Sequence, residues 1–209
     1  MTVQPPDTVH GALTSHLRLT ISASLIGLYR IDDSFESRVD CTTGFSRRFI
    51  QDHDESNQQH KNVYDIFPDS GFFRQSGIDS VMLTVKEPLD ETAFLYWART
   101  LDLEPGDTLR LNRYFRPDRN QITIAVLERD TLDVPAGRFA TLVVQPTIPD
   151  GGLLFSEEAE ARVWLSDDER RLVVQMKLKL LGFATVALRL EEYDMPEVGS
   201  SCSAKVGAP

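Results

Sequence analysis

The chain has 209 residues, 32 of them acidic and 22 basic, which gives a formal net charge of −10 at pH 7. This charge argues against nucleic-acid binding and against adsorption to anionic lipid, since both need a basic surface. Apolar residues make up 41% of the chain, but there is no apolar run of about 18 residues, so no transmembrane segment is predicted.

The first part of the chain predicts a coil followed by strands. Pro5 and Pro6 lack backbone donors, so residues 1–11 are expected to form a disordered N-terminal segment. Apolar and polar residues then alternate over His16–Ala23, which is typical of a half-buried strand. Further strands are expected at Ser34–Val39, Gly44–Asp52, Lys61–Phe67 and Asp79–Val85, with turns at 41–44 and 68–71, an irregular or helical corner at 25–30 and a polar loop at 52–59.

One helix is predicted near residues 89–101. Asp90 is expected to cap its N-terminus, because a carboxylate there accepts hydrogen bonds from the exposed amides of the first turn. Residues three and four positions apart lie on the same side of a helix, and here they form an apolar stripe that should pack on a sheet. The stripe consists of Phe94, Trp97, Ala98 and Leu101.

After Gly106 the pattern is entirely that of short strands and turns. Alternate residues of Leu172–Leu180 are expected to lie on opposite faces of a strand. Gln175, Lys177 and Lys179 are expected on the wet face. The residues expected on the dry face are Leu172, Val174, Met176, Leu178 and Leu180. The full set of expected strands is Thr108–Phe115, Gln121–Glu128, Phe139–Gln145, Ala159–Leu165, Leu172–Leu180 and Ala184–Leu190.

The fold class predicted from these elements is all-β and mainly antiparallel. We expect a curled sheet or an open β-barrel with the helix near 89–101 packed on it. Residues 12–194 are expected to form a single β-rich domain, and residues 195–209 a disordered tail.

Few residues qualify for catalysis or metal binding. His53 and His60 flank acidic residues, but their spacing matches no ligand pattern, so a solvated acidic loop is the favoured interpretation. Two pairs of neighbouring carboxylates occur, Asp32-Asp33 and Asp167-Asp168. Adjacent side chains point apart, so neither pair alone makes a glycosidase site. The pair Asp167-Asp168 is predicted to form a turn.

No nucleophile elbow and no phosphate-binding glycine loop is present in the sequence. No catalytic, cofactor-binding or metal-binding residue is therefore predicted, and a non-catalytic protein is favoured over an enzyme. Several large side chains have two open interpretations: they line an apolar ligand pocket, or they fill the core, which is favoured for each residue taken singly. These residues are Tyr96, Trp97, Phe115, Trp164, Met176 and Phe183.

Segments in a fixed order resemble a known family. They are YRIDDSFESRVD (29–40), FSRRFIQDHDE (45–55), FLYWARTLDLEPGDTLRL (94–111), VPAGRFATLVVQP (134–146) and ARVWLSDDERRLVVQMKLKLLGFATVALRLEEY (161–193). Over about residues 10–193 they resemble the bacterial domain-of-unknown-function family numbered 3108. The resemblance implies a β-rich envelope protein of the periplasm and supplies no catalytic residues.

Members of that family usually carry an export signal and one or two opening strands before the segment that corresponds to residues 16–37. This chain starts almost at that segment, and the strand at 17–23 would otherwise lie near an unprotected sheet edge. We therefore expect the true start upstream of Met1 and a periplasmic location; a complete chain would instead be cytoplasmic, since it shows no secretory signal. Cys41 and Cys202 are the only cysteines, and their pairing stays open.

Two functions from different classes follow from this pattern. The first is binding of a lipid-like or other hydrophobic small molecule in the curled sheet. The alternative is a structural or assembly factor that binds another envelope protein, for example by adding a strand at a sheet edge; a carboxylate-dependent hydrolase is a weaker alternative. A large apolar cavity would favour the first, and a filled interior with an exposed apolar edge would favour the second.

Overall fold

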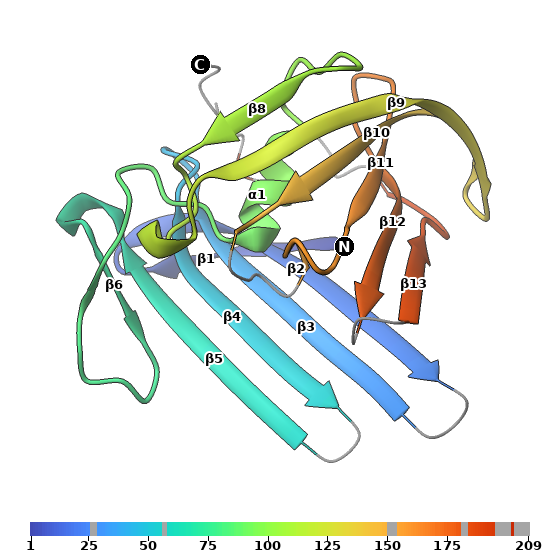
Figure 1. The fold of residues 1–209 in the computed structure, drawn as a ribbon. Helices are drawn as coiled ribbons and strands as arrows, with labels where there is room; N and C mark the ends of the chain where they lie inside the picture. The colour runs from blue at the N-terminus through green and yellow to red at the C-terminus, as the bar shows by residue number, and fades with distance from the viewer. Residues whose placement is uncertain (26–28, 56–57, 150–153, 181–183, 195–201, 203–209) are drawn as a thin grey trace. The chain divides into compact units, whose positions relative to one another are not determined.

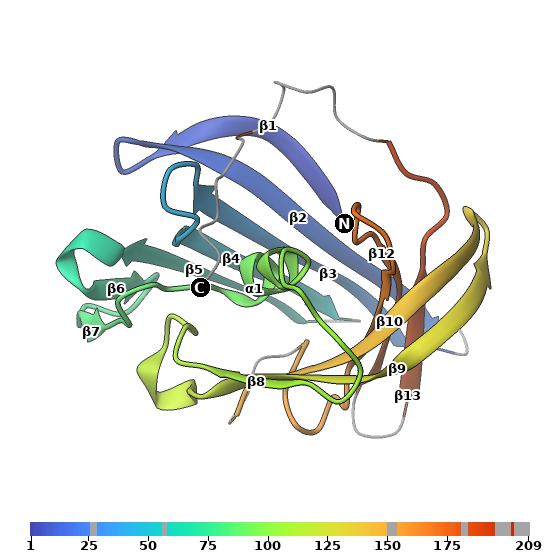
Figure 2. The ribbon, with the colours of Figure 1, turned by 90° about the horizontal axis from the view of Figure 1, so that it is seen from above.

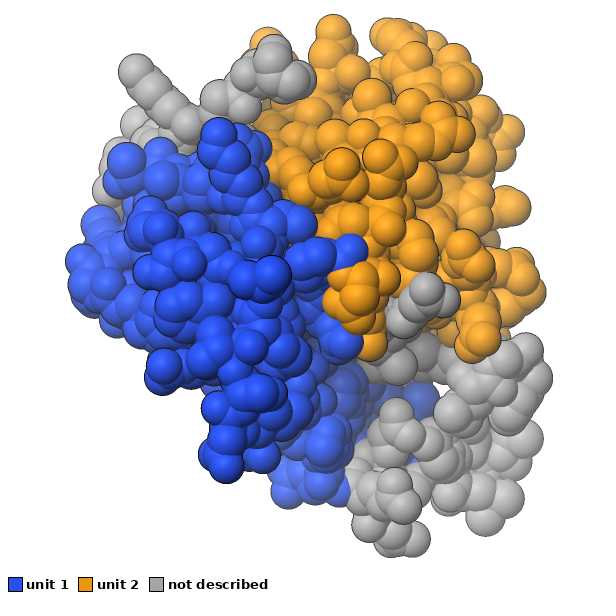
Figure 3. Space-filling view, turned by 60° about the vertical axis from the view of Figure 1, so that its left-hand side comes forward, with its two compact units in different colours: residues 1–96, 115–117, 196–209 blue, residues 97–114, 118–195 orange. Residues whose placement is uncertain are grey.

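The computed structural model describes residues 1–25, 29–55, 58–149, 154–180, 184–194 and 202, and it consists of two antiparallel sheets and one α-helix (Figure 1). Neither sheet closes into a barrel, so of the two predicted architectures the open, curled sheet is confirmed. The chain divides into two compact units, coloured separately in Figure 3: residues 1–96, 115–117 and 196–209 form the first, and residues 97–114 and 118–195 the second. The predicted single domain over 12–194 stays a prediction.

The first unit contains a seven-stranded sheet whose spatial order follows the sequence (Figure 2). Every neighbouring pair is antiparallel, so the sheet is a meander of hairpins. A 3-10 turn at Pro68–Ser70 ends at Gly71, whose φ of 73° is the left-handed conformation that glycine adopts without steric cost. The strands are β1 (Thr2–Val9), β2 (Ala12–Leu25), β3 (Tyr29–Asp40), β4 (Ser46–Glu55), β5 (Gln58–Phe67), β6 (Phe72–Gln75) and β7 (Met82–Leu83).

The expected coil at residues 1–11 is wrong, because Thr2–Val9 forms strand β1. The two prolines lie where the β1–β2 register shifts, between Gln4 and Asp7. An edge strand tolerates proline because one side of its backbone needs no partner in the sheet. β1 thus pairs with β2 along the edge that we expected residues upstream of Met1 to cover.

The expected loop at 52–59 is also wrong, because β4 continues to Glu55 and β5 begins at Gln58. Polar cross-strand pairs stabilise this extension in place of apolar ones; Lys61 Nζ, for example, lies 3.3 Å from Asp52 Oδ2. The expected corner at 25–30 is likewise strand at Leu25 and from Tyr29, while residues 26–28 lie outside the described residues. The expected strand at 79–85 shortens to Met82–Leu83, and β6 was not predicted.

The second unit contains a six-stranded antiparallel sheet in the order β13 to β8, again a meander. The predicted dry face of β12 is confirmed, since Leu172, Val174, Met176 and Leu178 are all buried. The predicted exposure of Gln175 is wrong: it is buried, and its Oε1 accepts a hydrogen bond of 3.2 Å from Arg189 Nε. The strands are β8 (Thr108–Leu111), β9 (Ile122–Val134), β10 (Gly137–Thr147), β11 (Arg162–Ser166), β12 (Val173–Leu180) and β13 (Ala184–Arg189); a 3-10 turn spans Pro117–Arg119.

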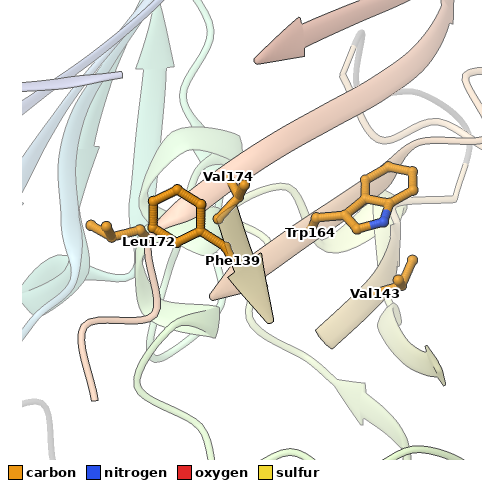
Figure 4. Packing of buried hydrophobic residues seen from close by; sticks show 5 residues of the cluster. All are labelled: Phe139, Val143, Trp164, Leu172 and Val174. Atoms are coloured by element: carbon orange, nitrogen blue, oxygen red, sulfur yellow. The ribbon is translucent and has the colours of Figure 1, made fainter. Parts of the chain in front are cut away.

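A cluster of buried side chains packs within the second unit (Figure 4). Trp164 is 6% exposed, and its Nε1 donates a hydrogen bond of 3.1 Å to Asp130 Oδ2. The Lys177 ammonium lies 5.1 Å from the centre of the same indole ring. The N–H of Trp164 is therefore hydrogen-bonded, and one face of its ring makes a cation–π contact. The cluster consists of Phe139, Val143, Trp164, Leu172 and Val174.

Helix α1 (Glu91–Ala98) starts at the predicted N-cap. Asp90 Oδ1 accepts hydrogen bonds from the amides of Thr92 (3.0 Å) and Ala93 (2.9 Å). The same residue attaches the helix start to the first sheet, because Ser37 Oγ on β3 donates to Asp90 Oδ2 (2.6 Å) and the Asp90 amide donates to Ser46 Oγ on β4 (2.9 Å). Burial raises the pKa of Asp90 to about 6.

None of the helices in the described part of the chain is long and apolar enough to cross a membrane.

Candidate functional site

The buried face of strands β2 to β5, here called the inner face, is crossed by rows of side chains from neighbouring strands. Alternate residues of each strand share this face, and the antiparallel register sets which of them lie side by side. The first row includes Ser37, the residue that contacts the cap of α1. Successive rows are Leu17, Ser37, Phe49 and Tyr64; then Leu19, Phe35, Gln51 and Asn62; then Ile21, Asp33, His53 and His60.

The third row, here called the polar row, holds a buried carboxylate beside an imidazole. His53 Nδ1 lies 3.0 Å from Asp33 Oδ2, as an ionic contact rather than an aligned hydrogen bond. The Phe35 ring meets the His53 ring edge to face, with 5.5 Å between the ring centres. Asp33 Oδ1 is buried and accepts no hydrogen bond from any residue that the structure describes. A buried polar atom of this kind is normally paired with a donor from the protein, from an ordered water or from a ligand.

The solvent exposure of the side chains in the polar row decreases from β5 to β3. His60 on β5 is exposed, the His53 side chain is 19% exposed, and the Asp33 side chain is 4% exposed. The row lies near the ends of β2 to β5 that are remote from α1 (Figure 1). A group that enters beside His60 would therefore pass His53 before it reaches Asp33.

The chemistry that the polar row supports is binding. A carboxylate next to an imidazole attracts donors and cations, and it repels anions. The same contact can orient a histidine for catalysis, but by itself it supplies no nucleophile.

The predicted interpretation of the carboxylate pairs is confirmed. Asp33 lies on the inner face, whereas Asp32 makes an ion pair with Arg30 on the other face. Asp168 is a turn residue, since its Oδ1 accepts hydrogen bonds from Ser166 Oγ (2.7 Å) and from the Arg170 amide (3.1 Å). Neither pair therefore places two carboxyl groups across a shared cleft.

His53 and His60 lie on paired strands rather than on the loop that we expected, and they face each other across β4 and β5. Within the described ranges, no group of three or more histidine, cysteine, aspartate or glutamate side chains is arranged to hold a metal ion.

The residues predicted to line a ligand pocket are divided between the two units. Tyr96 and Phe115 belong to the first unit, where Phe115 packs against the rings of Tyr64 (5.2 Å) and Phe73 (5.1 Å). Trp97, Trp164 and Met176 belong to the second unit and are buried there, and Phe183 lies outside the described residues. Their role as ligand lining stays a prediction.

Sequence reasoning missed Asp33, although a signal for it was present. Ile31, Asp33 and Phe35 have the same strand parity, so a strand that buries Ile31 and Phe35 also buries the carboxylate between them. When Asp32-Asp33 is considered only as a pair of carboxylates, Asp33 is not assigned to the buried side of the strand.

A model of the family described as "Protein of unknown function (DUF3108)" matches residues 1–186 of this chain. No curated protein matches the chain, and no solved structure matches it.

Proposed function

Since the chain belongs to the DUF3108 family, whose function is unknown, we propose that it is a non-catalytic binding protein of the bacterial envelope. Its ligand is a hydrophobic, lipid-like molecule held against the inner face of the first sheet. One observation carries the proposal: the sheet is open, and six buried apolar side chains on three neighbouring strands gather on its inner face, beside the polar residues Ser37 and Asp33. The apolar side chains are Leu17, Leu19, Ile21, Ile31, Phe35 and Phe49.

Binding at this face requires movement, because each of these side chains is at most 4% exposed. Helix α1 is the element that we propose to move, since its start is attached to the inner face by the hydrogen bonds of Asp90 with Ser37 and Ser46. Breaking these hydrogen bonds would free the start of α1 to leave the row of Ser37, where Leu17 and Phe49 would then contact the ligand's apolar chain.

The envelope location is supported by a disulfide bond. Cys41, in the turn after β3, is bonded to Cys202, and their Cα atoms are 5.2 Å apart, which is within the usual range for this bond. Disulfides persist in oxidising compartments such as the periplasm and are rare in the cytosol.

Native mass spectrometry tests the proposed function. The chain purified without detergent is expected to carry a lipid-sized adduct, or to take up one molecule of dodecan-1-ol when incubated with it. Ile21→Trp, which adds volume to the inner face, should weaken uptake about tenfold, at a stability cost of about 1–3 kcal/mol.

Thr20→Trp is the matched control, because Thr20 is exposed on the opposite face of the same strand; uptake by this variant should equal that of the wild type. A clean mass of the unligated chain, with no uptake by the folded wild type, would contradict the proposal.

A second candidate function, binding of another envelope protein, is favoured by one feature of the sheet edge. β7 ends the strand order of the first sheet and has β6 as its one neighbour among the described strands. Three large apolar side chains around it are exposed: Ile78 by 44%, Val81 by 51% and Leu83 by 78%. An exposed apolar edge is a template for an added strand.

Photo-cross-linking in cells tests this second candidate. A photoreactive residue at position 83 should give one discrete protein adduct, and Val81→Lys should remove that adduct while changing stability by less than about 0.5 kcal/mol. The same residue at position 13 is the control, because Leu13 is 57% exposed but lies on β2, towards the other edge. Equal adducts at both positions would indicate non-specific contact and refute the candidate.

A further inference from the structure

We propose that the polar row is the recognition site for the polar end of the ligand, and that it selects an amphiphile with a cationic, hydrogen-bond-donating head, such as an ammonium, over one with a carboxylate head. This inference rests on the proposed function of the first sheet and names the ligand class of that same face.

The first argument is the unused acceptor on Asp33. A carboxylate accepts hydrogen bonds through both of its oxygens, and an acceptor that is buried without a partner destabilises the folded state. Asp33 Oδ1 is such an acceptor, while Oδ2 lies 3.0 Å from His53 Nδ1. The group that would complete this site is therefore an N–H or O–H donor.

The second argument is the position of Asp33 beside the apolar rows. Its neighbours on the inner face include Ile21 on β2 and Phe35 on its own strand, which are 2% and 0% exposed. An alkyl chain that lies along these side chains places its head group at the polar row. The gradient of exposure from His60 through His53 to Asp33 gives the head group a route from solvent.

The third argument is charge. The described side chains of the polar row contribute one carboxylate, two imidazoles and no lysine or arginine. An ammonium gains a charge-assisted hydrogen bond to Asp33, whereas a carboxylate head would place two like charges side by side in a poorly hydrated site.

Two probes with the same apolar chain test the inference: dodecan-1-amine and dodecanoic acid, titrated calorimetrically into the full chain at pH 8, where the amine is protonated and the acid ionised. Wild type should bind the amine at least about tenfold more tightly than the acid. Asp33→Asn should abolish this preference, mainly through a loss of about tenfold in affinity for the amine.

Asp54→Asn is the matched control, since it removes the same charge from an exposed residue of β4 that follows His53 in the sequence and lies on the opposite face of the strand. The amine preference should survive in this variant. Equal loss of preference in both variants would reveal a general charge effect and overturn the inference.

The remaining outcomes separate this inference from the proposed function. If folded wild type binds neither probe, the proposed function itself fails. If wild type binds both probes equally, the sheet binds hydrophobic ligands but the polar row does not select the head group, and only the inference falls. If Asp33→Asn weakens both probes in proportion, Asp33 is merely structural, and the inference is again overturned.

Discussion

Replacing Asp90 by alanine is expected to lower the free energy of unfolding by about 3 kcal/mol or more. The substitution removes the acceptor for the Thr92 and Ala93 amides and leaves the Ser37 hydroxyl without its acceptor, at a position that is 0% exposed. Loss of an N-cap costs about 1 kcal/mol, and each buried donor left unpaired costs about 1–3 kcal/mol. Urea unfolding followed by circular dichroism at pH 5 measures the loss.

The pH matters because burial raises the pKa of Asp90 from 3.8 to about 6. At pH 5 the folded chain keeps the Asp90 proton, so the alanine variant gains nothing from removing a buried charge. A loss of less than about 1 kcal/mol at this pH would show that the cap does not hold α1 to the sheet.

Asp90→Asn is the informative control, since it keeps the Oδ1 acceptor and is neutral at every pH. Between pH 3.8 and about 6 the folded wild type binds a proton that the unfolded chain has released, so wild-type stability falls as the pH rises through this window. The penalty is complete above pH 6 and is of the order of 3 kcal/mol. The stability of the Asn variant relative to wild type should therefore improve by about that amount from pH 4 to pH 7. Parallel pH profiles of the two proteins would contradict this account.

The parts of the fold that could be predicted from sequence are those in which one physical requirement dominates. Burial of one side of a strand imposes a period of two, which is why Leu172, Val174 and Met176 were placed correctly. An N-cap needs a short acceptor before the first turn, which is why Asp90 was assigned its role.

The parts that could not be predicted depend on neighbours that are distant in the sequence. Residues 52–59 are polar and look like a loop, but pairing with neighbouring strands extends β4 to Glu55 and lets β5 begin at Gln58. Pro5 and Pro6 are tolerated because β1 lies at an edge, a fact of topology rather than of local sequence.

The polar row illustrates the same limit for the site. The parity of β3 predicts that Asp33 points inward, but only the register of β4 brings His53 within 3.0 Å of it. The unused acceptor at Asp33 Oδ1 is likewise a property of packing. The aromatic residues chosen from sequence were large enough to line a pocket, but size alone does not say which unit each one belongs to.

Removal of the disulfide bond is expected to destabilise the chain by about 2–5 kcal/mol. Cys41 and Cys202 are 161 residues apart in sequence, and in the chain-entropy model a cross-link over so long a loop restricts the unfolded chain strongly, by about 5 kcal/mol at most. Cys41→Ser removes the bond without adding bulk, and guanidinium unfolding of wild type and variant under non-oxidising conditions measures the difference.

The double variant with Cys41→Ser and Cys202→Ser separates the cross-link from the thiols. Dithiothreitol should lower the unfolding midpoint of wild type to that of the double variant and should leave the double variant unchanged. Because the bond acts mainly on the unfolded state, the folded chains should give the same circular dichroism spectrum. If dithiothreitol shifts the unfolding midpoint of the double variant, the reductant acts other than through this bond. If the bond of the wild type is reduced but its unfolding midpoint stays unchanged, the cross-link contributes no stability.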